Sequence, residues 1–495
     1  MYIAMQGHDF HFELENVARL FLPQESIRHG APEAMPASGL AAYTLLERRA
    51  EDTRLFVRLT LDDFDASEEA TVDNAAADYK DECELQMATL LYHLLVKLCG
   101  FEQSWGVLTG VRPVKLLRRM TAERGADAAH AWFRDRLLLS PEKLALCERT
   151  LAAEDRLLAL SRPESFSLYI AVPFCPTRCD YCSFVSYTVE RAAKLIPPYV
   201  ELLCREIRRT GEIAHDLGLR LETIYVGGGT PTTFSAEQLA QVMAAVEASF
   251  DLSTLREYTV EAGRPDTVTA DKLSAIRAGG AHRVSINPQT LSDKVLAAIG
   301  RRHTTAQFYN AFDAARAVGF DCINTDLIAG LPGDDEESFA RTMDGILALR
   351  PENVTVHTLS LKRASNLVVE HRGELPSSDA AVRMVACSAA ALPAAGYHPY
   401  YLYRQSRMAG NQDNVGWSLP GHDGLYNVYI MDETHTILGV GAGAVSKLKQ
   451  PGTNYLERIF NYKFPYEYNR DFDEMLRRKE AVYDFYARYG ASSAT

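Results

Sequence analysis

The feature that most constrains the fold is a repeat of strand followed by helix that begins near Ser167. Short β-branched and apolar runs alternate with longer stretches of helical periodicity, which predicts strands that pair in parallel. Such a sheet either curls into a barrel or stays open, and both forms carry their chemistry in loops at the carboxyl ends of the strands. The six predicted strands are residues 168–172, 223–226, 258–260, 283–286, 322–327 and 354–359. The predicted helices between them are residues 192–213, 236–248, 271–278, 305–318 and 336–349.

The residues before this repeat do not show the same regular alternation of strand and helix. Residues 41–46 and 55–61 are predicted strands, and a further predicted helix begins at Ser140. We interpret the acidic residues 62–84 as a solvated loop leading into a helix whose apolar face spans residues 87–98. A chain of 495 residues is too long for one hydrophobic core. The expected parts are residues 1–162, an N-terminal α+β domain of unknown role; residues 163–365, the repeat; and residues 366–495, a C-terminal region whose last predicted helix spans residues 471–486.

Composition argues against several classes of function. The formal net charge of −13 opposes attraction to phosphate backbones, so nucleic acid is not an expected partner. We expect no stable membrane insertion, because no apolar run is long enough to cross a bilayer. The first residues lack the pattern of a secretory signal, and nine mostly scattered cysteines are typical of a reduced compartment. The expected location is therefore cytoplasmic.

Three cysteines are not scattered and follow the first predicted strand in one loop. The spacing of Cys175, Cys179 and Cys182 lets their thiols surround a single metal centre. A structural zinc site is closed by four ligands, and no fourth ligand follows nearby. An iron–sulfur cluster with three cysteine ligands keeps one iron open, and that iron can chelate an amine and a carboxylate. A zinc loop with a distant fourth ligand and three unrelated cysteines are the alternatives.

Polar and glycine-rich segments follow the other predicted strands. The run Gly-Gly-Gly-Thr-Pro at residues 227–231 would let backbone groups approach a ligand closely, although an ordinary glycine turn has the same pattern. Glu261 and Gln289 end the third and fourth strands, and Asp326 lies in the fifth. A polar side chain beside apolar runs needs a partner, which is either a ligand or a structural hydrogen bond. We interpret His282, His303 and His357 as packed residues outside the metal site.

These motifs resemble those of a known superfamily. Cys-x3-Cys-x2-Cys at residues 175–182 is similar to the signature of radical S-adenosylmethionine enzymes. Its flanking residues 169–175, with residues 227–232 and 326–333, resemble the subgroup of oxygen-independent coproporphyrinogen III dehydrogenases and heme chaperones. The closest resemblance is to the HemZ-type branch, in residues 356–365, 400–405 and 441–446. The resemblance covers roughly residues 165–450 and implies an α/β fold: a partial (β/α)6 radical SAM barrel with an N-terminal α+β domain and a C-terminal extension.

The resemblance also implies cofactors and the residues that hold them. Cys175, Cys179 and Cys182 would ligate a [4Fe-4S] cluster, whose open iron would bind S-adenosyl-L-methionine. Tyr169, Glu261 and Asp326 are the expected catalytic residues. The residues expected to line adenosylmethionine are Tyr169, Tyr181, Gly228, Gly229, Thr230, Glu261, Gln289, Arg301, Asp326, Ser360 and Val445.

The activity implied by the resemblance is oxidative decarboxylation of two propionates of coproporphyrinogen III to vinyl groups in anaerobic heme biosynthesis. The expected partners are this tetrapyrrole, an electron donor of the flavodoxin or ferredoxin type, and an electron acceptor. Propionates call for cationic partners, and the candidates are Lys362, Arg363, Arg404 and Arg407. Phe184 departs from the dehydrogenases, which have a further cysteine there, and matches the heme-chaperone branch. A heme-binding chaperone and another radical reaction on a tetrapyrrole, such as methyl transfer or ring opening, are therefore the alternatives.

Overall fold

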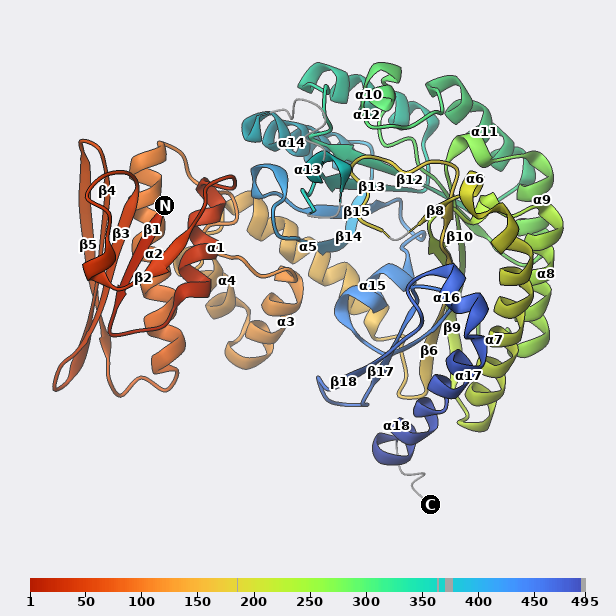
Figure 1. Ribbon diagram of the computed structural model, residues 1–495, viewed down its shortest axis with the longest axis horizontal. Helices are drawn as coiled ribbons and strands as arrows, with labels where there is room; N and C mark the ends of the chain where they lie inside the picture. The colour runs from red at the N-terminus through yellow and green to blue at the C-terminus, as the bar shows by residue number, and fades with distance from the viewer. Residues whose placement is uncertain (185, 363–364, 370–376, 491–495) are drawn as a thin grey trace. The chain divides into compact units, whose positions relative to one another are not determined.

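The computed structural model describes residues 1–184, 186–362, 365–369 and 377–490 (Figure 1). The chain forms two compact units. The first comprises Met1–Cys147 with Arg404–Gln412, and the second comprises Glu148–Tyr403 with Asp413–Thr495. The division lies inside helix α5 (Pro141–Leu158), whereas the sequence placed a boundary near residue 162. The second half of α5 belongs to the second unit because Ala153 packs into a cluster with Tyr400, Tyr401 and Val428.

The first unit contains a five-stranded sheet in the order β2-β1-β3-β4-β5. The strands at residues 41–46 and 55–61 and the helix over residues 87–98 are confirmed. The loop predicted over residues 62–84 is wrong, because strand β5 occupies its first half. Its carboxylates pair across the strands: Asp65 with Arg58 at 2.5 Å and Glu69 with Arg54 at 2.7 Å. The elements are β1 (Tyr2–Gln6), α1 (His11–Phe21), β2 (Arg28–Gly30), β3 (Ala41–Arg48), β4 (Asp52–Leu61), β5 (Phe64–Asp73), α2 (Tyr79–Cys99), α3 (Pro113–Arg124) and α4 (Ala126–Asp135).

The second unit is built on six neighbouring parallel strands, and all six sequence predictions are confirmed. Their side chains are mostly buried, which explains why each strand reads as an apolar run. In the described part of the chain the sheet does not close on itself; it forms a partial (β/α)6 barrel. The strands, in sequence and spatial order, are β6 (Ser165–Val172), β9 (Arg220–Gly228), β10 (Glu257–Gly263), β11 (Arg283–Ile286), β12 (Cys322–Ala329) and β13 (Asn353–Thr358).

The crossover helices lie along the outside of this sheet (Figure 1). Their ends follow local rules, as α8 and α11 begin with capping boxes made by Ser235 with Gln238 and by Thr304 with Gln307. Gly319 ends α11 in the left-handed region, with φ of 85°. The helices are α7 (Ile196–Asp216), α8 (Ala236–Ser249), α9 (Ala270–Ala278), α11 (Thr305–Val318) and α12 (Glu336–Leu349), and the short helices are α6 (Val189–Ala192), α10 (Asp293–Ala298) and α13 (Asn366–Val369).

The C-terminal region extends both edges of the sheet to eleven strands. β16 pairs in parallel with β6, and β15 pairs antiparallel with β13. The single helix predicted over residues 471–486 is divided into α17 and α18 at Glu480. The elements are α14 (Ser378–Ala394), β14 (His398–Tyr403), β15 (Asn414–Ser418), α15 (Leu425–Asp432), β16 (Thr436–Val440), β17 (Val445–Lys449), β18 (Leu456–Phe460), α16 (Pro465–Arg470), α17 (Phe472–Lys479) and α18 (Ala481–Tyr489).

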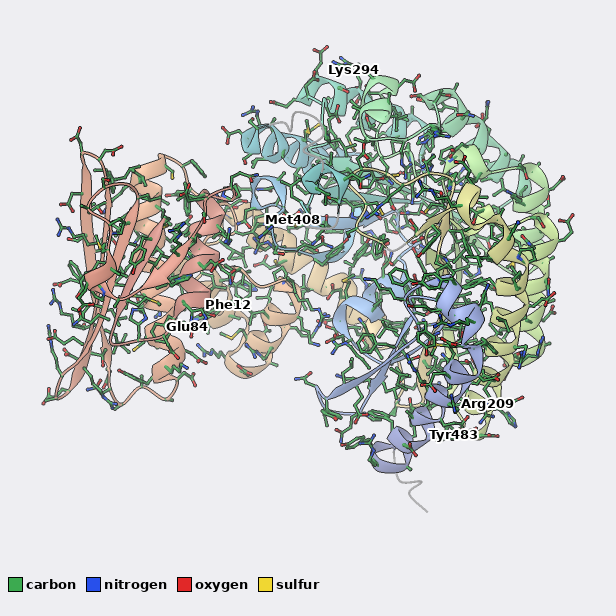
Figure 2. The ribbon with its side chains drawn as sticks, in the orientation of Figure 1. Phe12, Glu84, Arg209, Lys294, Met408 and Tyr483 are labelled. Carbon is green, nitrogen blue, oxygen red and sulfur yellow. The ribbon has the colours of Figure 1, made fainter. Side chains whose placement is uncertain are left out.

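The last helix is held against α7, as Figure 2 shows for Arg209 and Tyr483. The Arg209 guanidinium lies 5.7 Å from the Tyr483 ring centre and 2.7 Å from a carboxylate oxygen of Glu480. Among the described residues, no helix has both the length and the apolar character needed to span a bilayer.

Candidate functional site

The cysteine loop follows β6 and begins in a short parallel pair, β7 (Phe174–Cys175) with β8 (Tyr187–Thr188). The backbone N–H of Cys182 donates to the carbonyl of Cys179 at 3.1 Å, which turns the loop back on itself. Asp180 fixes its middle, because its N–H donates to the Ile299 carbonyl at 3.1 Å and its carboxylate accepts from the Asn366 amide at 3.1 Å. The loop is thus held by residues that follow β11 and β13 in the chain.

The three thiols lie in sheltered surroundings. Burial raises the pKa of Cys175 and raises that of Cys182 to about 11, so both thiols keep their protons until a metal replaces them. No group of three His, Cys, Asp or Glu side chains within the described ranges is gathered tightly enough to hold one metal ion. A cubane cluster differs from a single ion, because each thiolate binds a different iron. The donor set therefore fits the cluster better than it fits zinc.

The glycine loop after β9 is hydrogen-bonded to the strand that enters the cysteine loop. The N–H of Gly229 donates to the Val172 carbonyl at 2.8 Å, and that of Thr230 donates to the Phe174 carbonyl at 2.7 Å. A Cβ at Gly229 would lie 2.5 Å from the Phe174 carbonyl oxygen, so only glycine permits this approach. A Cβ at Gly227 would lie 3.0 Å from the Glu261 carboxylate. The loop therefore brings bare backbone between the thiols and Glu261.

Glu261 lies beside a group of stacked tyrosines. The Tyr225 hydroxyl donates to Glu261 Oε1 at 2.5 Å. The rings of Tyr225 and Tyr426 are stacked at 4.5 Å, and Tyr169 is stacked on Tyr426 at 6.1 Å. Burial raises the pKa of Glu261 to about 7 against the opposing effect of the Tyr225 hydrogen bond, and nearby Asp326 raises it further. A carboxyl group that titrates near neutral pH thus lies beside an aromatic surface.

Gln289 and Arg301 carry buried polar atoms that lack partners among the described residues: the Gln289 side-chain oxygen and the Arg301 Nε. Gln289 has φ of 68°, a strained value for a residue with a side chain, and its backbone bridges to β12 beside Asp326. Burial would lower the pKa of Arg301, but nearby Tyr181 and Cys179 raise it overall. Buried atoms without partners are costly unless a ligand satisfies them. These atoms therefore fit a polar cofactor lying next to the cysteine loop.

Comparison with known proteins agrees with this geometry. The family model "Radical SAM superfamily" matches residues 169–346. The oxygen-independent coproporphyrinogen-III oxidase-like protein HemZ of Bacillus subtilis is 35% identical over 98% of this chain and 99% of its own length. The chain belongs to the HemZ-type branch of the radical SAM superfamily. This superfamily implies a [4Fe-4S] cluster and S-adenosylmethionine.

Two further proteins are similar to this chain over part of its length. The heme chaperone HemW of Bacillus subtilis is 30% identical over 63% of this chain and 80% of its own length. The solved structure of the coproporphyrinogen III oxidase HemN from Escherichia coli, a radical SAM enzyme, matches with a TM-score of 0.52 and 22% identity. That match covers 66% of this chain and 73% of HemN, and at this identity it supports the fold alone.

The other residues predicted for a HemZ-type site are more dispersed. Ser360 and Lys362 are half-buried after β13, and Val445 begins β17. Arg363 lies outside the described residues. Arg404 belongs to the first unit, where its guanidinium is stacked 4.8 Å from the Trp105 ring centre and donates to the Leu108 carbonyl.

Arg407 also belongs to the first unit, where it is exposed with φ of 61°. The cofactor-side residues are thus brought together around the cysteine loop. Arg404 and Arg407 are part of the first unit, and the cysteine loop is part of the second.

Two tyrosines of the site were not identified from the sequence. Tyr225 directly precedes the glycine loop, a position that could have singled it out. Tyr426 comes from α15 in the C-terminal region, and no local pattern marks it. His357 was expected to be packed and hydrogen-bonded outside the metal site, and its Nε2 lies 3.8 Å from Asp326 Oδ2 while its Nδ1 lies 3.4 Å from the Tyr403 hydroxyl.

The pKa of Glu261 leads to a prediction about stability. Between about pH 4.5 and about pH 7 the folded chain retains the Glu261 proton that the unfolded chain has released, so this residue makes the free energy of unfolding fall as the pH rises. Glu261→Gln removes that dependence and still accepts from Tyr225. We compare the free energies of unfolding of the variant and of the unaltered chain, both without cofactor. As the pH rises from 5 to 8, their difference should shift in favour of the variant by about 1–2 kcal/mol. Urea unfolding of both proteins at pH 5 and at pH 8 measures this shift. A stability difference that is the same at the two pH values would contradict the prediction.

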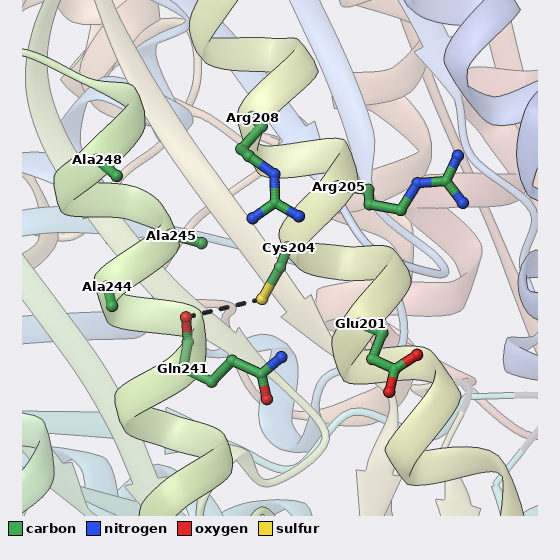
Figure 3. A pocket seen from close by; sticks show the side chains of 8 residues that line it. All are labelled: Glu201, Cys204, Arg205, Arg208, Gln241, Ala244, Ala245 and Ala248. Atoms are coloured by element: carbon green, nitrogen blue, oxygen red, sulfur yellow. Dashed lines mark hydrogen bonds between the residues drawn. The ribbon is translucent and has the colours of Figure 1, made fainter.

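A separate pocket of about 410 Å³ lies on the outer face of α7 and α8 (Figure 3). The Cys204 thiol donates to the Gln241 carbonyl there at 3.7 Å. None of the predicted site residues lines this pocket, and we assign it no chemistry.

Proposed function

We propose that this chain is a radical S-adenosylmethionine enzyme that decarboxylates two propionates of coproporphyrinogen III to vinyl groups. The observation that carries the proposal is that the cysteine loop, the glycine loop and the region of Gln289 and Arg301 surround buried polar atoms, which have no hydrogen-bond partner among the residues that the structure describes. The near full-length relation to the coproporphyrinogen oxidase-like HemZ supports the choice of substrate.

The cofactor side of the proposal assigns roles to this chain's residues. Cys175, Cys179 and Cys182 would hold the cluster, and the open backbone at Gly228 and Gly229 would receive the amino-acid end of adenosylmethionine. The side chains that would line the rest of it are those of Tyr169, Tyr181, Thr230, Glu261, Gln289, Arg301, Asp326, Ser360 and Val445. When bound, the cluster and adenosylmethionine supply an electron and a carbon radical that removes a hydrogen atom from the substrate.

The tyrosines would then act on the substrate side. Stacked rings such as Tyr225 and Tyr426 offer a flat apolar surface and exclude water from a radical. Each propionate loses a hydrogen atom, carbon dioxide and one further electron as the vinyl group forms. We propose that this electron leaves to a separate acceptor and that a flavodoxin or ferredoxin type of donor reduces the cluster.

Lys362 is the best placed of the proposed propionate partners, because it follows β13 in the same unit as the cysteine loop and is half-buried. Its positive charge would be partly desolvated, which strengthens a charge-assisted hydrogen bond. We expect Lys362→Met to raise the KM for coproporphyrinogen III about tenfold and to change kcat much less. The control is Lys294→Met, which removes an exposed lysine of α10 (Figure 2). Equal KM values for the two variants would contradict this role.

The test of the function is an anaerobic assay of the reconstituted full chain with reductant, adenosylmethionine and coproporphyrinogen III. Formation of protoporphyrinogen with release of carbon dioxide supports the proposal. Cleavage of adenosylmethionine without decarboxylation would overturn it. The mass of the tetrapyrrole product would reveal methyl transfer or ring opening.

A heme-binding chaperone is the second candidate function. The relation to HemW and the exposed Phe184, 68% accessible two residues after the third cysteine, favour it. Stoichiometric heme binding and heme transfer, with no turnover of coproporphyrinogen III, would establish this candidate in place of the enzyme.

A further inference from the structure

Arg264 reaches into the cysteine loop from the turn that follows β10. Only 3% of its side chain is exposed. Its Nη1 lies 3.6 Å from the sulfur of Cys179 and donates to Thr177 Oγ1 at 2.9 Å. A guanidinium carries its positive charge at every accessible pH, so a fixed cation lies against one of the three proposed cluster ligands.

Asp266 determines the direction in which this guanidinium points. Its two carboxylate oxygens accept from Arg264 Nε at 3.0 Å and from Nη2 at 2.8 Å. This bidentate ion pair occupies one side of the guanidinium and leaves Nη1 directed at the cysteine loop. The Thr267 hydroxyl also donates to the Arg264 carbonyl at 2.8 Å. Arg264 is therefore held in one orientation before any cofactor binds.

A second thiol contact, at Cys175, is of a different kind. Cys175 receives a hydrogen bond from the neutral hydroxyl of Thr230, with Oγ1 and Sγ 3.6 Å apart. Reduction of a cluster adds a negative charge that spreads onto its thiolate ligands. A cation at Cys179 stabilises that added charge more strongly than a hydroxyl does, whereas the Asp266 carboxylate opposes it.

We propose that Arg264 is a positioning residue that raises the reduction potential of the cluster through its hydrogen bond to Cys179, and that Asp266 limits this increase. Arg264 would thereby set how readily an electron enters the site. The inference rests on the proposed cluster and does not depend on the tetrapyrrole reaction.

The test is an anaerobic redox titration of the reconstituted full chain, followed by electron paramagnetic resonance of the reduced cluster. We expect Arg264→Met to lower the equilibrium constant for one-electron reduction about tenfold, which is a shift of about 59 mV to lower potential. Asp266→Asn should shift the potential in the opposite direction, because the guanidinium keeps its charge and loses its counter-charge. Arg264→Lys, which keeps the charge but not the fork, should give a smaller negative shift than Arg264→Met.

The matched control is Lys272→Met. The Lys272 ammonium also lies in this region, where it donates to the carbonyls of Thr232 at 2.6 Å and Thr267 at 3.1 Å, and neither of these contacts involves a cysteine. Equal potentials for Arg264→Met and Lys272→Met would overturn the proposal, as would a shift of Asp266→Asn to lower potential. If Arg264→Met assembles no cluster, the potentials of Arg264→Lys and Asp266→Asn test the proposal instead. Equal potentials for those two variants would overturn the proposal. The potential is measured without tetrapyrrole, so decarboxylation can fail while this result stands.

Discussion

Replacement of Cys175 by alanine is expected to abolish both assembly of the cluster and cleavage of adenosylmethionine. Cys175 ends β7 and is tied to the glycine loop through Thr230. A cluster with three protein ligands cannot lose one of them, since the fourth iron must stay open for the amine and carboxylate of adenosylmethionine. We expect iron and sulfide content after anaerobic reconstitution, and the visible absorption of the cluster, to fall to background. Release of 5′-deoxyadenosine under reductant should fall with them.

The control for this change is Cys204→Ala. Cys204 is a buried cysteine of α7 whose thiol donates to the Gln241 carbonyl, and it lies outside the loop. We expect this variant to keep its full iron content. Cleavage of adenosylmethionine by Cys175→Ala at the unaltered rate would rule out the three-cysteine cluster. Equal loss of iron from both variants would show that the iron is held nonspecifically by thiols.

The fold could be predicted from the sequence where burial produces a recognisable pattern of residues within a single strand or helix. The six parallel strands are mostly buried, so each reads as an apolar run, and the helices α8, α9, α11 and α12 begin with side-chain caps. β5 was missed because its carboxylates are balanced by Arg54 and Arg58 of the neighbouring strand, and a charged run alone resembles a solvated loop. β16 was missed because its partner, β6, lies far away in the sequence.

The site divides in the same way. The cysteines, the glycine loop, Glu261 and Asp326 follow predicted strands, so a motif and a position coincide. The stacking of Tyr169 with Tyr426 depends on how α15 packs, and the contact of Arg264 with Cys179 depends on a turn that follows another strand. Each of these residues is ordinary in its own segment. They acquire a role in the site only because the fold places them in contact with one another.

Replacement of Lys479 by methionine is expected to be among the most destabilising changes in the second unit. Lys479 Nζ lies 3.0 Å from Glu206 Oε1, and the two side chains are 1% and 0% exposed. This buried pair joins α17 to α7, and the Glu206 carboxylate also accepts from the Gly441 N–H at 2.7 Å, directly after β16. Methionine would leave a buried carboxylate without its counter-charge. We expect the free energy of unfolding to fall by about 3–5 kcal/mol at neutral pH, measured by urea unfolding.

A double variant tests whether the uncompensated charge is the cause. The double variant Glu206→Gln with Lys479→Met should recover part of the stability, since neither charge then remains. Glu480→Gln is the matched control, because it breaks the exposed ion pair between Arg209 of α7 and Glu480, the residue after α17, and should cost at most about 1 kcal/mol. A loss for Lys479→Met no larger than that of the control would show that this buried pair does not hold the C-terminal region against the barrel.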